Sequence, residues 1–273
     1  MIPFAKTHAC GNDFLIVTEE AAKGCDWADL TRRLCARNTG IGADGIEFFA
    51  WTGPKAGRIR LLNADGSVAE ISGNGTRSVA AWMALERGFQ PGDELRLDTD
   101  AGLRICHVNT IDADDGYSAE MTAGMGTPTF APRAVTLTDG TVVAGVEVSM
   151  GNPHFVIVVS DSEFSFAGRT WAELGAEICV HADFPQQTNV EFVRIVGAQE
   201  IEIRIFERGV GPTSSSGTGS SATATAALAF NGCVSPLRVA SPGGAQTVAW
   251  EGPGTELKLT GPATLIAHGE AWY

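Results

Sequence analysis

The sequence predicts an α/β protein of two pseudo-symmetric domains, each a mostly antiparallel or mixed sheet around one buried helix. Three observations lead to this fold class. Two segments recur at nearly one spacing, strand-like segments outnumber helix-like ones, and one alanine-rich segment is small on every face. The 273 residues are enough for one large domain or two of moderate size.

The longer repeat joins residues 58–88, RIRLLNADGSVAEISGNGTRSVAAWMALERG, to residues 202–232, EIRIFERGVGPTSSSGTGSSATATAALAFNG, without a gap. Ser72 and Ser216 align in the two copies of Ser-Gly-x-Gly. Each copy begins with alternating apolar residues, which is typical of a strand. A polar loop, the Ser-Gly-x-Gly turn and an alanine-rich helix follow, and Gly88 and Gly232 are the predicted C-caps.

A second repeat precedes each copy of the first. GNDFLIVTEE at 11–20 resembles GNPHFVIVVS at 151–160, and both predict an apolar strand after Gly-Asn. Two ordered repeats predict two similar domains facing each other across a cleft, and we expect them at residues 1–120 and 121–262. The last strand, 263–273, is a candidate to complete the first domain. The helix SSATATAALAF should be buried all round.

Charge and composition limit the partners. A net charge of −13 with no basic run disfavours nucleic acid. None of the six cysteines forms a CxxC pair or a zinc-finger spacing, as expected for thiols in a reducing cytosol. The N-terminus has no signal-peptide pattern, and no stretch approaches 18 apolar residues. We therefore expect a cytoplasmic protein with a small-molecule substrate and no membrane contact.

The two Ser-Gly-x-Gly turns are candidate anion sites, because a helix N-terminus offers unpaired N–H groups and a partial positive charge. GTGSSA at 217–222 fits a dinucleotide-binding pattern, but no acidic residue occurs between Glu207 and Glu251 to hold a ribose. No G-x-S-x-G elbow indicates a serine hydrolase. His154 could approach a serine, although a histidine here is more often a satisfied polar residue at a strand start.

A third interpretation uses the symmetry. Inverting a carbon centre requires one group to remove a proton from one face and another to deliver a proton to the opposite face. Two similar turns, one in each domain, suit that requirement. A cysteine at such a turn would ionise readily, whereas a serine is a far weaker acid and needs a partner base.

Six motifs in order resemble the diaminopimelate epimerase family, which epimerises an amino acid without a cofactor. They are HACGNDFLIV (8–17), NTGIGADGI (38–46), NADGSVAEISGNGTR (63–77), MGNPHFVI (150–157), TNVEFV (188–193) and ERGVGPTSSSGTGSSA (207–222). The resemblance implies two pseudo-symmetric α/β domains, each wrapped round a central helix. It also implies isomerase activity in lysine and peptidoglycan-precursor synthesis, with the substrate in the cleft and neither pyridoxal phosphate nor a metal.

The resemblance also implies the site residues. The family's substrate-binding asparagines fall on Asn12, Asn63, Asn152 and Asn189. Glu207 and Arg208 would hold the distal amino-acid end, which suits an ammonium and a carboxylate respectively. Backbone donors around the α-carboxylate would come from Gly73, Asn74, Gly217 and Thr218. By themselves, the asparagines read equally as turn or cap residues, and the Glu-Arg pair as a surface ion pair.

The catalytic positions depart from the family. Two cysteines are expected before Gly-Asn-Gly and Gly-Thr-Gly, and this chain has Ser72 and Ser216 there. Ser78 and one of Ser220 and Ser221 also stand where the family often has cysteine. Three explanations stay open: a natural relative with altered chemistry, an engineered Cys→Ser form, or a relative that only binds. A related isomerase or dehydratase is a further alternative.

The C-terminal LIAHGEAWY predicts a strand that ends in exposed aromatics. Such a strand is either the edge of a homodimer or the last strand of the core, and the second is commoner.

Overall fold

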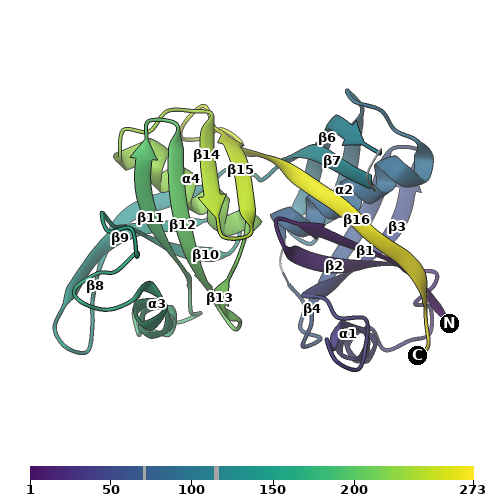
Figure 1. Cartoon of the computed structure of the whole chain (residues 1–273), viewed down its shortest axis with the longest axis horizontal. Helices are drawn as coiled ribbons and strands as arrows, with labels where there is room; N and C mark the ends of the chain where they lie inside the picture. The colour runs from purple at the N-terminus through teal and green to yellow at the C-terminus, as the bar shows by residue number, and fades with distance from the viewer. Residues whose placement is uncertain (70–71, 114–116) are drawn as a thin grey trace. The chain divides into compact units, whose positions relative to one another are not determined.

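The computed structural model describes residues 1–69, 72–113 and 117–273. The Glu70 and Ile71 positions of the first repeat therefore lie outside the described residues. The chain divides into two units, which are described separately (Figure 1). Unit 1 comprises Met1–Gly124 and Thr260–Tyr273, and unit 2 comprises Met125–Leu259. The domain bounds expected from the sequence, 1–120 and 121–262 with 263–273 completing the first domain, stay a prediction.

Strands dominate both units, and each unit has two helices among its described residues. Unit 1 contains β1 (Ile2–Ala9), β2 (Asn12–Thr18), α1 (Trp27–Cys35), β3 (Gly45–Gly53), β4 (Ala56–Asn63), α2 (Gly73–Arg87), β5 (Glu94–Thr99), β6 (Gly102–Asp112) and β7 (Tyr117–Gly124). Unit 2 contains β8 (Thr129–Thr136), β9 (Val142–Ser149), β10 (Pro153–Val158), α3 (Trp171–Cys179), β11 (Asn189–Gly197), β12 (Glu200–Glu207), β13 (Gly211–Thr213), α4 (Gly217–Phe230), β14 (Leu237–Ser241) and β15 (Gly244–Ala249). The last strand, β16 (Lys258–Ala271), begins in unit 2 and continues through unit 1.

The sheet of unit 1 closes on itself. Its strands follow the order β1-β2-β3-β4-β5-β6-β7-β16, and β16 also pairs with β1. Ile2 lies opposite Ala271 in this antiparallel pair. The pairs β2–β3 and β4–β5 are parallel, while β1–β2, β3–β4, β5–β6 and β6–β7 are antiparallel. β16 is therefore an interior strand of a mixed sheet and leaves no edge there, in agreement with the commoner reading of LIAHGEAWY.

Unit 2 repeats this arrangement. Its sheet follows the order β8-β9-β10-β11-β12-β14-β15, continued by the start of β16, and the short β13 pairs with β12. The pairs β10–β11 and β12–β14 are parallel, like β2–β3 and β4–β5 of unit 1. The segment before the second Ser-Gly-x-Gly turn, expected to be a polar loop, contains this short strand. Within the described residues, no helix combines the length and apolar character needed to cross a bilayer.

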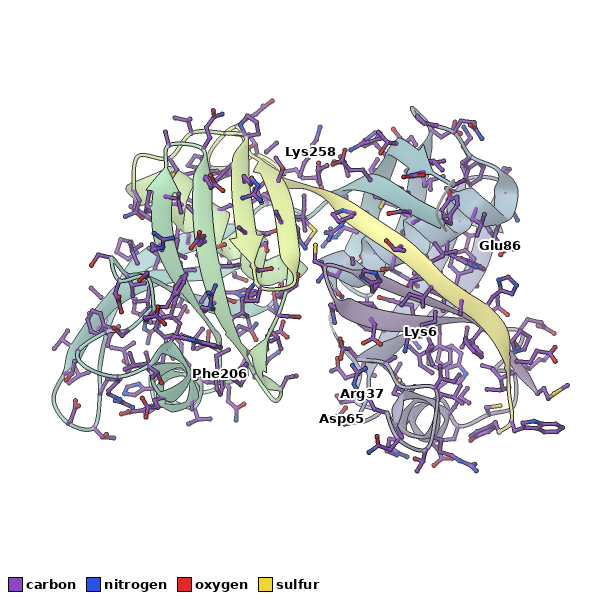
Figure 2. The ribbon with its side chains drawn as sticks, viewed as in Figure 1. Lys6, Arg37, Asp65, Glu86, Phe206 and Lys258 are labelled. Atoms are coloured by element: carbon purple, nitrogen blue, oxygen red, sulfur yellow. The ribbon has the colours of Figure 1, made fainter. Side chains whose placement is uncertain are left out.

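The two alanine-rich helices occupy the middle of their own units (Figure 1). In α2, residues 73–84 are buried, and in α4 residues 217–227 are buried, which confirms the helix that the sequence predicts to be enclosed on every side. In α4, the buried residues are all Gly, Ala, Ser or Thr, and such small side chains let strands approach the helix from all directions. α1 and α3 instead pack on the outside of the sheets. Gly175 of α3, for example, lies against the Cβ of Phe206 on β12, which is labelled in Figure 2.

One helix end differs from the prediction. α2 ends at Gly88, which adopts a left-handed conformation (φ 66°) and donates its N–H to Ala84 and Leu85, as a C-cap glycine should. In α4 the C-cap is Asn231, and Gly232 follows it with φ 71°. The glycine thus reverses the chain one residue later than expected.

Packing around α2 sets the first prediction. A Cβ on Gly57 of β4 would lie 2.2 Å from Phe49 Cε2, and Phe49 is fully buried between Trp51 and Trp82. Because the ring has no free space, Gly57→Ala should lower the free energy of unfolding by about 1–3 kcal/mol. Urea denaturation measures this loss. Gly197→Ala, where nothing lies within 4 Å of the new Cβ, is the control, and equal stabilities would contradict the packing argument.

Candidate active site

Ser72 caps the enclosed helix of unit 1. It has extended backbone angles (φ −125°, ψ 120°), and its Oγ accepts the N–H of Gly75 at 3.0 Å. Its carbonyl accepts the N–H and the hydroxyl of Thr76, both at 2.8 Å. The glycines of Gly-Asn-Gly are therefore the first turn of α2 itself, and Ser72 is its N-cap.

Ser216 repeats this geometry in unit 2. It caps α4 with φ −145° and ψ 131°, and its Oγ accepts the N–H of Gly219 at 3.2 Å. The Thr218 hydroxyl lies 3.5 Å from the same oxygen. Ser216, Gly217 and Thr218 are all buried. Both predicted serines thus occupy one structural position, 144 residues apart, at the N-terminus of a buried helix.

Two predicted asparagines meet in unit 1. Asn74 lies in the first turn of α2 and donates from Nδ2 to Asn12 Oδ1 at 3.2 Å. Arg77, a fully buried arginine one turn later, donates to Asn74 Oδ1 at 2.7 Å and to the carbonyl of Gly73 at 3.2 Å. Burial lowers the pKa of Arg77 to about 10. Arg77 fixes the orientation of the Asn74 amide, so that its donor side faces Asn12.

Charged residues hold Asn12 from the other side. Asn12 Nδ2 donates to Asp44 Oδ2 at 2.6 Å, and the same carboxylate accepts the N–H of Asp13 at 3.1 Å. Arg37 bridges Asp44 and Asp13 at 2.7 and 2.8 Å, and Lys6 lies 3.1 Å from Asp13 (Figure 2 labels Lys6 and Arg37). Burial raises the pKa of Asp13, but hydrogen bonds from Arg37 and Lys6 outweigh it and leave that pKa below its ordinary value.

A second polar chain lies in unit 2. His154 is fully buried on β10 and bonds Glu191 Oε1 through Nδ1 at 2.7 Å. Its Nε2 lies 2.9 Å from Asn152 Oδ1, and Asn152 Nδ2 donates to Thr218 Oγ1 at 3.4 Å. This histidine is a satisfied polar residue of a strand, as its sequence position suggests. It also connects Asn152 and Thr218, two predicted site residues, to a buried carboxyl.

Glu207 lies beside Ser216. Burial raises the pKa of Glu207 above its ordinary value, and the hydrogen bond with the Ser216 hydroxyl opposes that rise. A carboxyl next to a serine is the partner base that a hydroxyl lacks on its own. The structure therefore brings together a predicted catalytic residue and a predicted substrate-binding residue of the same unit.

The other predicted residues lie at strand ends. Asn189 opens β11, donates to the Pro153 carbonyl at 3.1 Å and accepts the backbone N–H of Arg208 at 2.9 Å. The Arg208 guanidinium donates to the Gln186 carbonyl at 3.1 Å. Asn63 ends β4, is exposed, and donates to Ser67 Oγ at 3.1 Å.

The three other serines at positions where the family often has cysteine lie inside the helices: Ser78 in α2, and Ser220 and Ser221 in α4. Ser221 donates to the Gly217 carbonyl at 2.9 Å, inside the first turn of α4. Ser78 and Ser220 are buried in the same two helices. Ser220 and Ser221 lie about one turn beyond Ser216, and Ser78 lies six residues beyond Ser72, so none of them shares the cap position.

One carboxyl of unit 1 was not expected. Glu47, on β3, is 1% exposed, and neither of its oxygens has a hydrogen-bond partner among the described residues. Burial raises its pKa to about 8. Glu191 stands 144 residues later on β11 and is also fully buried. The sequence pattern of these strands does not predict that Glu47 and Glu191 are buried. A single Glu between apolar residues is usually interpreted as a position that faces solvent.

The two similar α/β units, each with a helix enclosed by its own strands, form a fold that is shared with solved epimerases and isomerases. The solved hydroxyproline epimerase of Agrobacterium vitis has this fold, with a TM-score of 0.70 and 17% identity over 98% of this chain and 90% of that one. A solved methylitaconate-delta-isomerase has it too, with a TM-score of 0.61 and 14% identity over 98% of this chain and 94% of that one.

The particular family follows from sequence. The family model described as diaminopimelate epimerase matches residues 4–130 and 146–266. The diaminopimelate epimerase of Corynebacterium glutamicum is 38% identical over 278 residues, and that of Teredinibacter turnerae is 34% identical over 281, each across 98% of both chains. The chain belongs to the diaminopimelate epimerase family.

The unpaired Glu47 carboxyl sets a prediction about stability. Its pKa is about 8 in the folded protein and about 4.3 in an unfolded chain. Between these values the unfolded state ionises first, so this group makes the free energy of unfolding fall as pH rises from about 4.3 to 8. Glu47→Gln should remove that part of the fall, worth about 1.4 kcal/mol for each unit of pKa difference.

Urea denaturation at pH 5 and pH 8 measures the difference in slope. Glu86→Gln, at an exposed position near the end of α2 in the same unit (Glu86 is labelled in Figure 2), is the control. If both variants keep the pH dependence of the unchanged protein, Glu47 is not the carboxyl responsible.

Proposed function

We propose that this protein is an amino-acid epimerase that inverts the α-carbon of diaminopimelate without pyridoxal phosphate or a metal, as a step of lysine synthesis. The observation that carries the proposal is the repeated serine cap: each unit presents one Ser-Gly-x-Gly turn, built in the same way, on an enclosed helix. Epimerisation needs two such groups, one to take a proton and one to give a proton.

In this proposal Ser72 and Ser216 are the acid/base groups. A serine hydroxyl is a weak acid, so each serine needs a neighbour that can accept or return its proton. Glu207 is that neighbour for Ser216, because burial raises the pKa of Glu207 and the nearby Ser216 hydroxyl is the largest influence that opposes this rise. A carboxyl that titrates closer to neutral pH exchanges protons in both directions more readily.

The substrate would be held by the polar groups around the two caps. Asn12, Asn63, Asn152 and Asn189 would contact its ammonium and carboxylate groups, because an amide both donates and accepts. Gly73, Asn74, Gly217 and Thr218 would direct backbone N–H groups at the α-carboxylate. Arg208 remains our candidate for contacts with the distal amino-acid end, whereas Glu207, which the same motif also assigns to that end, acts in this proposal as the partner of Ser216. Support comes from the fixed orientations of Asn12, Asn74 and Asn152 in their hydrogen-bond chains.

We also propose that the enzyme works in the cytoplasm and forms a homodimer. The support for a dimer is a set of exposed apolar side chains near the C-terminus: Ile266 is 52% exposed and Trp272 is 85% exposed. Where exposed apolar side chains form a contiguous patch, they often mark an interface.

The activity is tested with LL-diaminopimelate in deuterated buffer. The protein should exchange the Cα hydrogen for deuterium and form the meso isomer, because proton removal and return both pass through solvent-exchangeable groups. Proton NMR of the Cα signal follows the reaction, and Ser72→Ala with Ser216→Ala is the blank. Calorimetric binding without exchange would instead indicate a binding relative, and exchange only with an unsaturated acid would indicate another isomerase or a dehydratase.

A second prediction concerns the serines themselves. Ser72→Cys with Ser216→Cys should raise kcat by about 10²-fold or more, because a helix N-terminus lowers the pKa of a thiol and supplies a thiolate. The same variant should lose about 1 kcal/mol of stability, because a thiol is a poorer N-cap acceptor than a hydroxyl. Ser78→Cys, six residues further along the chain in α2, is the matched control. An inactive double variant would show that more than the thiols is missing.

A further inference from the structure

The buried Glu47 is positioned by its neighbours on the sheet. β3 is a central strand of unit 1, and Glu47 lies opposite Ile16 on β2 and Leu61 on β4. Its side chain therefore emerges among apolar residues, on the face of the sheet covered by α2. An ionisable group is expensive at such a place unless it is paired or neutral, and Glu47 has no hydrogen-bond partner among the described residues.

The carboxyl is aimed at the N-terminus of α2. A Cβ on Gly75 would lie 1.9 Å from Glu47 Oε1 and 3.2 Å from Ser72 Cβ. The carboxyl and the serine cap thus approach the same point, and the carboxyl reaches it only because residue 75 is glycine. Since Ser72 Oγ accepts the Gly75 N–H, its own O–H is left to be donated.

A small cavity connects the two groups. It has a volume of about 10 Å³, and Glu47, Ser72 and Thr76 line it together with Asp100. A space of about this size takes one water molecule. Asp100 is the other titratable group on this cavity, and it pairs with Arg60 at 3.5 Å at the surface. The cavity therefore offers Glu47 both a bridge to the serine and a route to solvent.

Comparison with unit 2 shows what unit 1 lacks. In unit 2, Glu191 is bonded to His154, and Ser216 interacts with a second carboxyl, Glu207. The aligned positions of unit 1 hold Phe14 in place of the histidine and Asn63 in place of Glu207. Neither can transfer a proton. Among these aligned, described positions, Glu47 is the titratable group that unit 1 retains next to its serine.

We propose that Glu47 is a positioning residue that acts through Ser72, and this proposal rests on the epimerase activity proposed above. As Ser72 Oγ takes the proton from the substrate Cα, the O–H bond already on Ser72 breaks and that proton passes to the Glu47 carboxylate. The electron pair of the broken C–H bond stays on the substrate. Ser216 gives its proton to the opposite face, and Glu207 restores the Ser216 O–H. In the reverse direction each step runs backwards.

The first test needs no turnover. In a Ser72→Cys background, the rate at which iodoacetamide alkylates the introduced thiol is followed against pH, with mass spectrometry to identify the peptide. Two coupled acids titrate in two steps, so the profile should show two steps with Glu47 present and one step after Glu47→Gln. Ser216→Cys with and without Glu47→Gln is the control and should give superimposable profiles. A single, unchanged step at position 72 would overturn the proposal.

The second test uses exchange of the Cα hydrogen in deuterated buffer. Glu47→Gln should lower kcat by about 10²-fold with little change in KM, and should remove one limb of the kcat–pH profile. Glu47→Asp, which keeps a carboxyl, should recover part of the loss, and Glu86→Gln should behave like the unchanged protein. Glu47→Gln with an unaltered kcat and pH profile would refute the role of Glu47.

The two tests separate the two proposals. If the unchanged protein exchanges no Cα hydrogen, the epimerase proposal fails, whereas the thiol titration still decides whether Glu47 is coupled to position 72. If exchange occurs but neither the titration nor kcat responds to Glu47→Gln, the epimerase proposal stands and the role of Glu47 fails.

Discussion

A helix enclosed on every side must satisfy its first N–H groups without help from solvent, and this constraint organises both units. Ser72 and Ser216 meet it by accepting the N–H of the third helical residue. The cap also gives each serine its direction, since its oxygen is held over the first turn. In a family whose expected residue is cysteine, serine strengthens the cap and weakens the acid. The same atom therefore serves stability and chemistry, and the two demands oppose each other.

The two units share the order and pairing of their strands, but they differ in the titratable residues near the two serines. β2, β3 and β4 of unit 1 match β10, β11 and β12 of unit 2 in order and pairing direction. On these matching strands, His154 of unit 2 corresponds to Phe14 of unit 1, and Glu207 of unit 2 corresponds to Asn63 of unit 1. Ser216 consequently lies beside the carboxyl of Glu207, while Ser72 faces the buried carboxyl of Glu47, which has no hydrogen-bond partner within the part of the chain that the structure describes. An epimerase that works in both directions does not need its two halves to be chemically identical.

Much of the fold could be predicted from the sequence. The constant offset located both enclosed helices, and small residues on every face of α4 explained why strands could surround it. The closure of β16 on β1 could not be read from alternation, because pairing between residues 2 and 271 has no local signature. The repeat located both serines at the start of their helices, whereas the site roles given to the serines and asparagines stay a prediction. The sequence did not indicate that Glu47, Arg77 and Asp44 belong to the site. Their roles depend on contacts with residues of neighbouring strands or helical turns, such as Asn12 and Asn74.

The path of β16 has a consequence for synthesis on the ribosome. Unit 2 is continuous in sequence, from Met125 to Leu259, so all of its residues emerge together. Unit 1 begins at the first residue but takes its last strand from Thr260–Tyr273. Its barrel stays open, with the edges of β1 and β7 unpaired, until almost the whole chain has been translated. Unpaired strand edges bind other strands readily, so the N-terminal half is the part of the nascent chain that most needs protection by a chaperone.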